Sequence, residues 1–451
     1  MRRIDPKALF FANHAGGLLH IETYGCQMNS GDSEVVASIM KAQGWGYTDD
    51  IHQADLILVN TCAIRDNAEQ RVWGRLVEMR SLKRARPWLL VGVIGCMAER
   101  LKNELTEREQ AVDIVAGPDS YRTLPELVRA AANGLPSINT KLSTDETYCE
   151  IEPVRFDKNG VSGFVSIMRG CNNMCAYCVV PYTRGTERSR PWQSIVDEAQ
   201  KLFEQGYREV TLLGQNVNSY NFEGVNFASL LSKVAAISPL LRLRFSTSHP
   251  KDLSDEVIAT MATTPNICRS IHLPAQSGSN RMLTLMNRKY TREWYLDRIA
   301  AIRRAMPDCS ISTDLIAGFC SETLEEHQMT MELMREVGYD FSYMFKYSER
   351  PNTKAARTMA DDITEQEKTR RLSELITLQN ELSLQSNSRE VGRRVEVLIE
   401  SLSRRSTEQL SGRSSQNKVV VFDRQDCKIG DYVQVEITQC SSATLKGKII
   451  K

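Results

Sequence analysis

Short apolar runs alternate with segments of helical periodicity through the first part of the chain. The apolar runs end near residues 25, 61 and 95, and helix-like segments follow them at roughly 30–43, 65–82 and 97–105. Runs that are apolar on both faces are typical of strands in a parallel sheet that helices cover on both sides. The pattern therefore predicts a parallel α/β domain over residues 18–134, followed by a turn-rich linker over 135–160.

A second alternation of strands and helices fills residues 161–386. The strand candidates lie near 164–169, 208–214, 241–247, 270–275, 310–317 and 339–347. Helical patterns such as Trp192 to Gln205 separate them, and six such units predict an incomplete parallel barrel. The capping pattern Thr364-Glu365-Gln366-Glu367 opens a long helix over 364–386, which is predicted to pack as a strut between domains.

The last block, residues 387–451, has short alternating stretches separated by polar turns. They cover residues 394–400, 418–422, 431–438 and 443–449, a spacing that predicts a small antiparallel barrel. The block holds 12 Lys plus Arg against 8 Asp plus Glu. Since small barrels of this kind often bind oligonucleotides, a basic surface here is compatible with an RNA partner.

The amino-acid composition says more about the cellular compartment of the protein than about its function. The chain carries 57 Lys plus Arg and 56 Asp plus Glu, so its overall charge does not indicate a nucleic-acid partner, and any basic surface must be local. The longest strongly apolar runs have about ten residues, too few to span a bilayer. Twelve cysteines in a large chain without a secretory signal, six of them in two metal-like triads, favour a reducing compartment, and we expect a cytoplasmic protein.

One cysteine triad directly follows the apolar stretch 163–168. Cys171, Cys175 and Cys178 form a C-x3-C-x2-C run, with no fourth Cys or His close by to complete a structural zinc site. Three thiolates on one short loop can instead hold three irons of a [4Fe-4S] cluster and leave the fourth iron open to a ligand. Three structural thiols at this density are the less favoured interpretation.

A second triad is dispersed in sequence but shares a topological position. Cys26, Cys62 and Cys96 each close one of the apolar runs of the first domain. Parallel sheets place ligands at the carboxyl ends of their strands, so these thiols are predicted to meet at one edge, again as three ligands of a metal centre. Any one of them alone would be read as a small core residue. The remaining cysteines are expected to be ordinary thiols: Cys149, Cys268, Cys309, Cys320, Cys427 and Cys440.

The first of these triads, with Tyr177 before its last cysteine, resembles the signature of the radical S-adenosylmethionine enzymes. That resemblance implies an open iron that chelates the amino and carboxylate groups of the cofactor and passes it one electron. The last block resembles a TRAM domain, in the strings at 417–422 and 430–433, and this resemblance implies RNA binding.

In this order the three blocks resemble a methylthiotransferase over nearly the whole chain. The strings that carry the resemblance are Tyr24 to Asn29 (YGCQMN), Val179 to Gly185 (VVPYTRG), Leu213 to Tyr220 (LGQNVNSY) and Leu273 to Ser279 (LPAQSGS). Together they are similar to the bacterial MiaB type. Membership of that subgroup implies conversion of N6-isopentenyladenosine, next to the anticodon of tRNA, to its 2-methylthio derivative.

Two alternative functions stay open at this point. One is a methylthiotransferase that acts on threonylcarbamoyl-adenosine in tRNA or on an aspartate of a ribosomal protein, and the string Cys26-Gln27-Met28-Asn29 argues against both. The other is a non-catalytic iron-sulfur protein that binds RNA and senses redox state. The complete cofactor barrel argues against that alternative.

The resemblance also implies two [4Fe-4S] clusters and S-adenosylmethionine as cofactors. The adenine C2–H bond is neither acidic nor easily displaced, so sulfur insertion there needs a radical that the cofactor supplies. Cys171, Cys175 and Cys178 are then the ligands of the cluster that cleaves the cofactor, while the Cys26, Cys62 and Cys96 cluster presents sulfur. The expected partners are the tRNA anticodon stem-loop and a flavodoxin- or ferredoxin-like electron donor, with no membrane; the chain is expected to be a monomer, and its sulfur source stays open.

Other cofactor contacts are expected at the ends of the barrel strands, where barrel enzymes place their working groups. The candidates are Gln215, Ser246, Gln276 and Asp314, together with Tyr177. Each of the first four side chains could equally cap a helix or form hydrogen bonds to the backbone of a loop.

Several nearby residues are interpreted more conservatively. Cys320 and Ser321 replace the Pro-Gly of the Gly-Phe-Pro-Gly-Glu turn that many relatives have, and Cys320 is expected to be a structural thiol. His249 and His272 are expected to be packed and hydrogen-bonded. The arginines that follow the cysteine loop are predicted either to meet RNA phosphates or to lie on a solvated loop; they are Arg184, Arg188 and Arg190.

Overall fold

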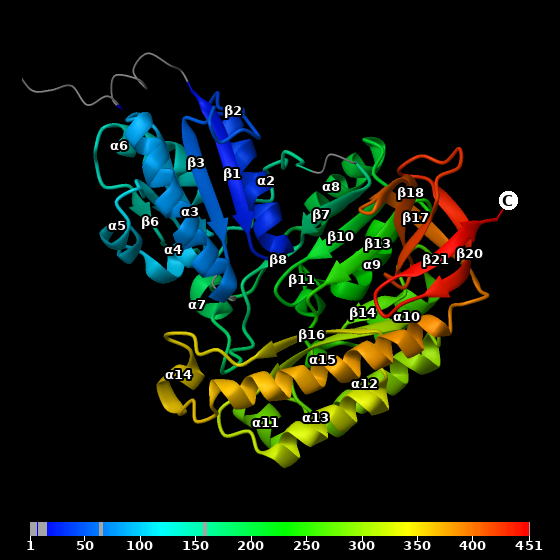
Figure 1. Ribbon diagram of the computed structural model, residues 1–451. Coiled ribbons are helices and arrows are strands. Elements are labelled where there is room, and N and C mark those ends of the chain that lie inside the picture. The colour runs from blue at the N-terminus through cyan, green and yellow to red at the C-terminus, as the bar shows by residue number, and fades with distance from the viewer. Residues whose placement is uncertain (1–6, 8–15, 63–65, 157–159, 451) are drawn as a thin grey trace, which may run out of the picture. The chain divides into compact units, whose positions relative to one another are not determined.

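The computed structural model describes residues 7, 16–62, 66–156 and 160–450 (Figure 1), which fall into two compact units. The first unit consists of residues up to 156 together with 169–172 and 178–188, and the second consists of 157–168, 173–177 and 189–451. The central and C-terminal blocks, which we expected as separate domains, therefore share one unit. The loop of the first cysteine triad contributes residues to both units.

The first unit contains a six-stranded parallel sheet in the order β2-β1-β3-β4-β5-β6. Its strands are β1 (Leu18–Tyr24), β2 (Gly46–Tyr47), β3 (Leu56–Thr61), β4 (Leu90–Gly95), β5 (Ile114–Ala116) and β6 (Ile138–Asn139). Its helices are α2 (Gln27–Lys41), α3 (Asp66–Ala85), α4 (Cys96–Leu101), α5 (Glu104–Arg108) and α6 (Leu124–Ala132), with a 3-10 turn at Tyr121–Thr123. The predicted parallel α/β domain is confirmed.

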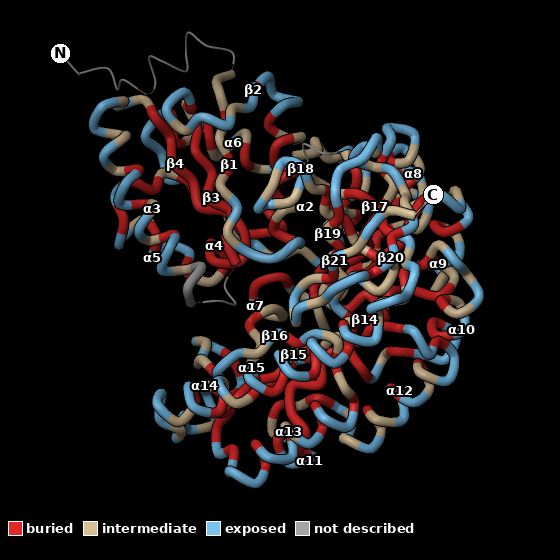
Figure 2. The backbone as a smooth tube through the Cα atoms, turned by 45° about the vertical axis from the view of Figure 1, so that its right-hand side comes forward, coloured by how far each residue is buried: buried red, intermediate tan, exposed pale blue. Residues whose placement is uncertain are grey.

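The continuous apolar character of the central strands follows from burial on both faces. Along β3, Leu56 and Leu58 pack toward α2 and α6, whereas Ile57 and Val59 pack toward α3 and α4. Figure 2 shows these strands as a buried layer. The stretch expected as a linker also belongs to this unit, because it contributes β6 and the buried ring of Tyr148.

The second unit contains the six predicted barrel strands, in sequence order around an incomplete barrel. They are β7 (Ser162–Ser166), β10 (Glu209–Leu213), β13 (Arg242–Ser246), β14 (Ser270–His272), β15 (Ser310–Ala317) and β16 (Phe341–Lys346). Parallel pairing joins β7, β10 and β13 in one sheet and β14, β15 and β16 in another, and a bridge between Leu243 and Ile267 connects the two sheets. The barrel is open between β7 and β16, its two edge strands.

Helices cover the outer side of these strands. The longer ones are α8 (Trp192–Glu204), α9 (Phe227–Ala235), α10 (Asp255–Thr263), α12 (Arg292–Ala305), α13 (Leu324–Val337) and α15 (Glu365–Ser388). The short elements of this unit are α11 (Asn280–Leu285), α14 (Lys354–Thr358), β11 (Asn221–Phe222), β12 (Val225–Asn226) and 3-10 turns at Val217–Ser219 and Pro250–Asp252. The helix α7 (Val180–Arg184) belongs to the first unit, and β8 (Met168–Arg169) and β9 (Arg188–Ser189) have one residue in each unit. Within the described ranges, no helix is both long and apolar enough to cross a membrane.

The helix α15 behaves as the predicted strut. Thr364 caps it by accepting a hydrogen bond from the Glu367 amide at 3.3 Å. Figure 1 shows α15 running beside β16, and its side chains Leu375 and Leu378 enter the barrel core. At its last turn Asn387 donates to the Ser441 carbonyl at 2.8 Å, which ties the helix to the C-terminal barrel.

The C-terminal block is a closed five-stranded barrel in the order β17-β18-β19-β21-β20. Its strands are β17 (Arg394–Ser403), β18 (Ser406–Ser414), β19 (Val419–Asp423), β20 (Tyr432–Cys440) and β21 (Leu445–Ile449). The predicted small barrel is confirmed, with two differences in detail. The prediction lacked β18, which is polar except for Leu410, and β19 pairs with β21 in parallel, so the barrel is not purely antiparallel.

Candidate functional site

The dispersed cysteine triad lies at one edge of the N-terminal sheet. Cys26 is the residue that precedes α2 after β1, Cys62 follows β3, and Cys96 opens α4 after β4. These three strands are neighbours in the sheet, so their carboxyl ends meet. A hydrogen bond from Cys62 is the largest influence that brings the pKa of Cys26 down to about 6; burial opposes it and Arg184 assists. Close approach is also required at Gly25, where an added Cβ would collide with Asn29 and lie 3.1 Å from Cys62 Cβ.

A buried arginine stands beside this triad. Arg184 donates from Nε to Cys96 Sγ at 3.2 Å and from Nη2 to Asp32 at 2.7 Å. Its Nη1 is buried and has no hydrogen-bond partner among the described residues. Asp32 also accepts from Arg169 at 2.8 Å, and although burial opposes ionisation, the two guanidinium groups hold the pKa of this carboxyl below its ordinary value.

The two predictions for the arginines after the cysteine loop were both wrong. Arg184, Arg188 and Arg190 are each at most 6% exposed. Arg188 donates to both carboxylate oxygens of Asp119, at 2.9 and 3.0 Å, and Arg190 is paired with Glu198. Buried guanidinium groups with carboxylate partners hold the fold around the loop, and they do not offer a surface to RNA phosphates.

The radical S-adenosylmethionine-like loop begins with a backbone constraint. Gly170 has φ +77°, and a Cβ there would collide with the Thr186 carbonyl. Cys171 donates its backbone N–H to the Gly185 carbonyl at 3.1 Å. Cys175 is buried, whereas Cys171 and Cys178 are half-buried.

In the second unit, Arg288 organises the middle of this loop. Its Nη1 donates to Cys175 Sγ at 3.2 Å and to the Tyr177 hydroxyl at 3.3 Å, while Nη2 donates to the Pro274 carbonyl at 2.9 Å. Ala176 is fixed from the other side, because its N–H donates to the Met286 carbonyl at 2.9 Å. The sequence offered no spacing signal that distinguishes Arg288 from the other basic residues.

The remaining candidate contacts lie on the barrel strands or just beyond them. Gln215 follows β10 by two residues and Ser246 is the last residue of β13. Gln276 follows β14, with φ +69° and its N–H bonded to the Asp314 carbonyl at 2.8 Å. Asp314 lies within β15 rather than at its end, and its carboxylate is 3.4 Å from His272 Nε2.

Five buried polar atoms, on four residues near the ends of β10 and β13, lack a hydrogen-bond partner within the described part of the chain. They belong to Gln215 (Oε1), Asn218 (both amide atoms), Ser248 (Oγ) and His249 (Nε2). His249 is only partly as expected: its Nδ1 accepts from the Lys251 N–H at 3.3 Å, and burial, with Arg288 and Lys251 adding to it, lowers its pKa to about 2. The imidazole is therefore neutral and presents Nε2–H as an unused donor. Asn218 was missed although it lies in the string Leu213 to Tyr220, and Ser248, which directly follows the strand predicted at 241–247, was missed as well.

The altered turn after β15 keeps its shape through carboxylates. Glu322 accepts from the Gly318 N–H at 2.7 Å and pairs with Arg371 at 2.8 Å. The Ser321 N–H donates to Asp362 at 2.7 Å. Cys320 is buried, and burial raises its pKa, as expected for a structural thiol.

The cysteine triads are better suited to iron-sulfur clusters than to a single metal ion. In the stretches that the structure describes, no group of three or more His, Cys, Asp or Glu side chains is arranged to hold one metal ion. A [4Fe-4S] cluster makes a different demand, because each thiolate binds a different iron. The three cysteines around the strand ends, one of them with a lowered pKa and with a buried cation beside the set, have the chemistry that such a cluster needs.

Comparison with known proteins supports the same organisation. Residues 18–117 match the family described as "Uncharacterized protein family UPF0004", residues 165–334 match the radical SAM superfamily, and residues 388–450 match the TRAM domain. A protein of Parabacteroides distasonis, named tRNA-2-methylthio-N(6)-dimethylallyladenosine synthase, is 58% identical over 96% of this chain and 95% of its own. A protein of Amoebophilus asiaticus with the same name is 56% identical over 96% of this chain and 92% of its own.

This chain belongs to the tRNA-2-methylthio-N(6)-dimethylallyladenosine synthase family. As a member of the radical SAM superfamily, it belongs to enzymes that use S-adenosylmethionine and a [4Fe-4S] cluster. A solved structure shares its fold: the radical S-adenosylmethionine methyltransferase TsrM from Kitasatospora setae, with a TM-score of 0.55 and 14% identity over 73% of each chain.

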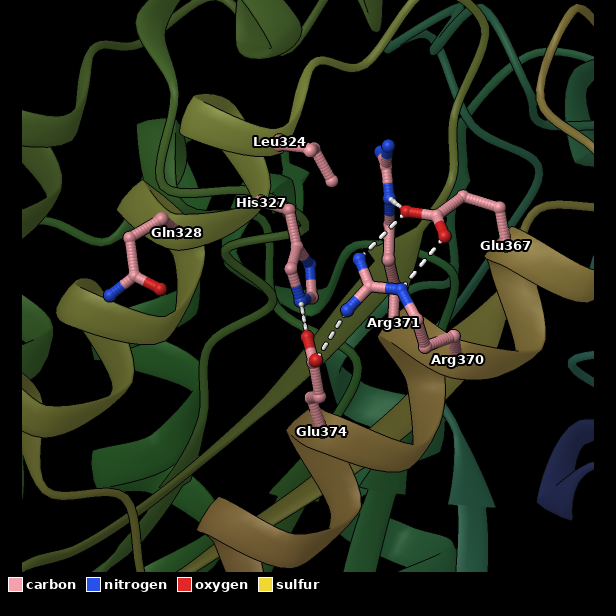
Figure 3. A pocket seen from close by; sticks show the side chains of 7 residues that line it. All are labelled: Leu324, His327, Gln328, Glu367, Arg370, Arg371 and Glu374. Carbon is pink, nitrogen blue, oxygen red and sulfur yellow. Dashed lines mark hydrogen bonds and ion pairs between the residues drawn. The ribbon is translucent and has the colours of Figure 1, made fainter.

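A surface depression of about 650 Å³ lies on the outer helix layer of the barrel, between α13 and α15 (Figure 3). His327 meets Glu374 at 2.8 Å, and Arg371 meets Glu367 at 2.8 Å. Arg370 lies between these two pairs and bonds to both carboxylates. None of the family-like strings contributes to this depression, so it is separate from the predicted chemistry.

Proposed function

We propose that this chain converts N6-isopentenyladenosine in tRNA to its 2-methylthio derivative, the product after which its relatives are named. The observation that carries the proposal is the meeting of Cys26, Cys62 and Cys96 at adjacent strand ends in a chain that also has a radical SAM barrel. A sulfur-inserting enzyme needs a second centre of this kind in addition to the one that handles the cofactor.

Each cysteine triad has a separate role in the proposal. Cys171, Cys175 and Cys178 would hold the cluster of the radical SAM superfamily, and Cys26, Cys62 and Cys96 would hold a second [4Fe-4S] cluster. When bound, the first cluster supplies the electron for reductive cleavage of S-adenosylmethionine, the chemistry required at a C2–H bond that no side-chain base can break. The lowered pKa of Cys26 makes its thiolate available as a ligand at neutral pH.

The barrel side chains would bind and orient the cofactor. Gln215 offers a buried amide oxygen without a partner in the described chain, which suits a cofactor N–H or O–H donor. Ser246, Gln276, Asp314 and Tyr177 are the other proposed contacts. Each of these polar groups lies on a barrel strand, on the segment after it, or on the cysteine loop.

The proposed partners follow from the same assignment. The TRAM domain and the names of the relatives support binding of tRNA, with the anticodon stem-loop as the segment that enters the barrel. A flavodoxin- or ferredoxin-like protein would supply electrons. We propose a monomer in the cytoplasm.

The test is mass spectrometry of tRNA nucleosides from cells that lack the gene. The 2-methylthio derivative of N6-isopentenyladenosine should disappear, and the wild-type gene but not Cys26→Ala should restore it. Loss of the threonylcarbamoyl-type derivative, or of a modified ribosomal aspartate, would assign the chain to another subgroup. Normal nucleosides in the deletion strain, with no deoxyadenosine formed by the purified protein under anaerobic reduction, would favour a non-catalytic redox sensor.

A further inference from the structure

An aromatic stripe runs along β16, one of the two edge strands of the barrel. Phe341, Tyr343 and Phe345 occupy alternate positions and are 49%, 50% and 38% exposed. Between them, Ser342 is buried and bonds to Gln379 of α15. Because side chains alternate along a strand, the three aromatic rings point away from the helix layer, toward the inner side of the barrel.

The neighbouring strands extend this stripe into a continuous surface. Asp314 of β15 is the register partner of Tyr343, and His272 of β14 is the partner of Ser312 on the same face. His272 bonds to Ser312 through Nδ1 at 3.0 Å, and its ring is edge-on to Tyr343 with centroids 5.8 Å apart. Phe341 and Tyr343 are also edge-on, at 4.9 Å. We call the surface of Phe341, Tyr343, Phe345, His272 and Asp314 the β16 face.

One end of the β16 face reaches the environment of the cysteine loop. Phe345 pairs in register with Ile316, and Ile316 packs with Ala176 and Tyr177 of that loop. The face therefore begins beside the proposed cofactor site and extends away from it along β16. Exposing large aromatic side chains to water is unfavourable, so an exposed group of them indicates a surface that a ligand or partner covers. Here the three rings line the side of the barrel on which the proposed reaction would take place.

We propose that the β16 face binds the target adenine together with its N6-isopentenyl group. Unpaired bases stack on exposed aromatic rings, and a prenyl group gains by the same burial, so a row of three rings suits both parts of this ligand. His272, whose Nε2 lies 3.4 Å from Asp314, borders the stripe with an imidazole able to bond to the polar edge of the base. This inference rests on the proposed function and specifies how the substrate would be chosen.

The test compares prenylated and unprenylated anticodon stem-loops with reconstituted full-length protein. Tyr343→Ala and Phe341→Ala should each weaken binding of the prenylated stem-loop by roughly tenfold or more, the range for loss of one stacking ring. Both variants should also have a smaller preference for the prenylated stem-loop over the unprenylated one and a higher KM for the prenylated stem-loop. Tyr343→Phe should retain most of that preference.

Leu384→Ala is the matched control, since Leu384 is 45% exposed on α15, outside the β16 face. Equal weakening of both stem-loops, or unchanged preference and KM, would overturn the inference. If the wild-type protein were a dimer and the Tyr343→Ala variant a monomer, a second copy of the chain would cover the β16 face instead. Absence of methylthiolation by the wild type would count against the proposed function, while the binding comparison would still decide whether the β16 face recognises the prenylated base.

Discussion

Arg288 donates from Nη1 to the sulfur of Cys175 at 3.2 Å, and its side chain is only 4% exposed. Burial opposes its charge, but the surrounding Tyr177, Tyr290 and Cys175 hold the pKa of the guanidinium well above its ordinary value. In the first unit, Arg184 reaches Cys96 Sγ at the same distance, 3.2 Å. In each proposed cluster site an arginine thus donates to a ligand sulfur, Cys96 in one and Cys175 in the other, an arrangement that tunes iron-sulfur clusters.

Replacing Arg288 should therefore change the redox potential of the first cluster. Arg288→Gln removes a positive charge beside a ligand sulfur, and that charge favours the more electron-rich reduced cluster. The midpoint potential should shift to more negative values by up to roughly 130 mV, given about 1.5–3 kcal/mol for a charge-assisted hydrogen bond and a one-electron couple. An anaerobic titration followed by electron paramagnetic resonance measures the shift.

A control on a nearby helix makes this result specific. Arg292 is half-buried and pairs with Glu336 at 3.0 Å, away from the cysteine sulfurs, so Arg292→Gln should leave the potential unchanged. An Arg288→Gln protein with full iron content and the wild-type potential would contradict the assigned role.

The iron content should separate the two triads. Two clusters correspond to about eight irons per reconstituted chain, and replacing all three cysteines of either triad by alanine should leave about four. The Cys171, Cys175 and Cys178 variant should form no deoxyadenosine. The Cys26, Cys62 and Cys96 variant should still form it but insert no sulfur. Cys149→Ala is the control and should retain both clusters; a wild-type protein with zinc, or with four irons, would refute the two-cluster proposal.

Glu99 of α4 should make the protein less stable as the pH rises. Burial, the largest influence, raises its pKa from 4.5 to about 7, and its Oε2 has no hydrogen-bond partner among the described residues. The folded state binds this proton more tightly than the unfolded state, so its stabilising effect is present below about pH 4.5 and is lost as the pH rises through 7. The cost at pH 8 should be on the order of 3 kcal/mol.

Melting temperatures of the apo chain test this prediction. Glu99→Gln should melt higher than wild type at pH 8, and the two curves should converge near pH 5. Glu104→Gln, on the neighbouring helix α5 and exposed, serves as the control and should show no such divergence. A constant difference between Glu99→Gln and wild type across this pH range would mean that Glu99 does not titrate there.

The parts of the fold that sequence predicted are those that depend on continuous burial. Strands such as β3 are buried at every position and begin with four consecutive apolar residues because helices cover both faces, and this pattern is visible without coordinates. β18 escaped prediction because its sequence STEQLSGRS places one large apolar residue, Leu410, in the core and exposes or half-exposes most of the rest. Short barrels need few inward side chains per strand, so the periodic signal is weak.

The candidate site divides in the same way. Both cysteine triads could be predicted from the sequence. The spacing within the cysteine loop depends only on neighbours in sequence, and the position of the other three cysteines at strand ends depends on sheet topology. The roles of Arg184 and Arg288 could not be predicted from the sequence, because an arginine near a loop is expected to be solvated until its burial is known. Asp32, which pairs with Arg184, is distant from it in sequence and carries no motif.

RNA affinity should depend on exposed basic residues of the C-terminal barrel rather than on the barrel as a removable piece. Deleting the barrel would strip Arg242 and Arg244 of their bonds to the carbonyls of Arg413 and Ser414, both at 2.7 Å, and would expose buried guanidinium groups of the second unit. Loss of binding on truncation would then confuse RNA contact with unfolding.

Substitutions at the turn between β17 and β18 avoid that problem. Arg404 and Arg405 are exposed there, so their joint replacement by alanine should weaken tRNA binding without destabilising the barrel. If both contact phosphates, the slope of log affinity against log salt should fall by about two. Arg335→Ala, at an exposed position on α13, is the control. Filter binding at several salt concentrations measures both quantities, and an unchanged slope in the double variant would direct the search to another basic surface of the chain.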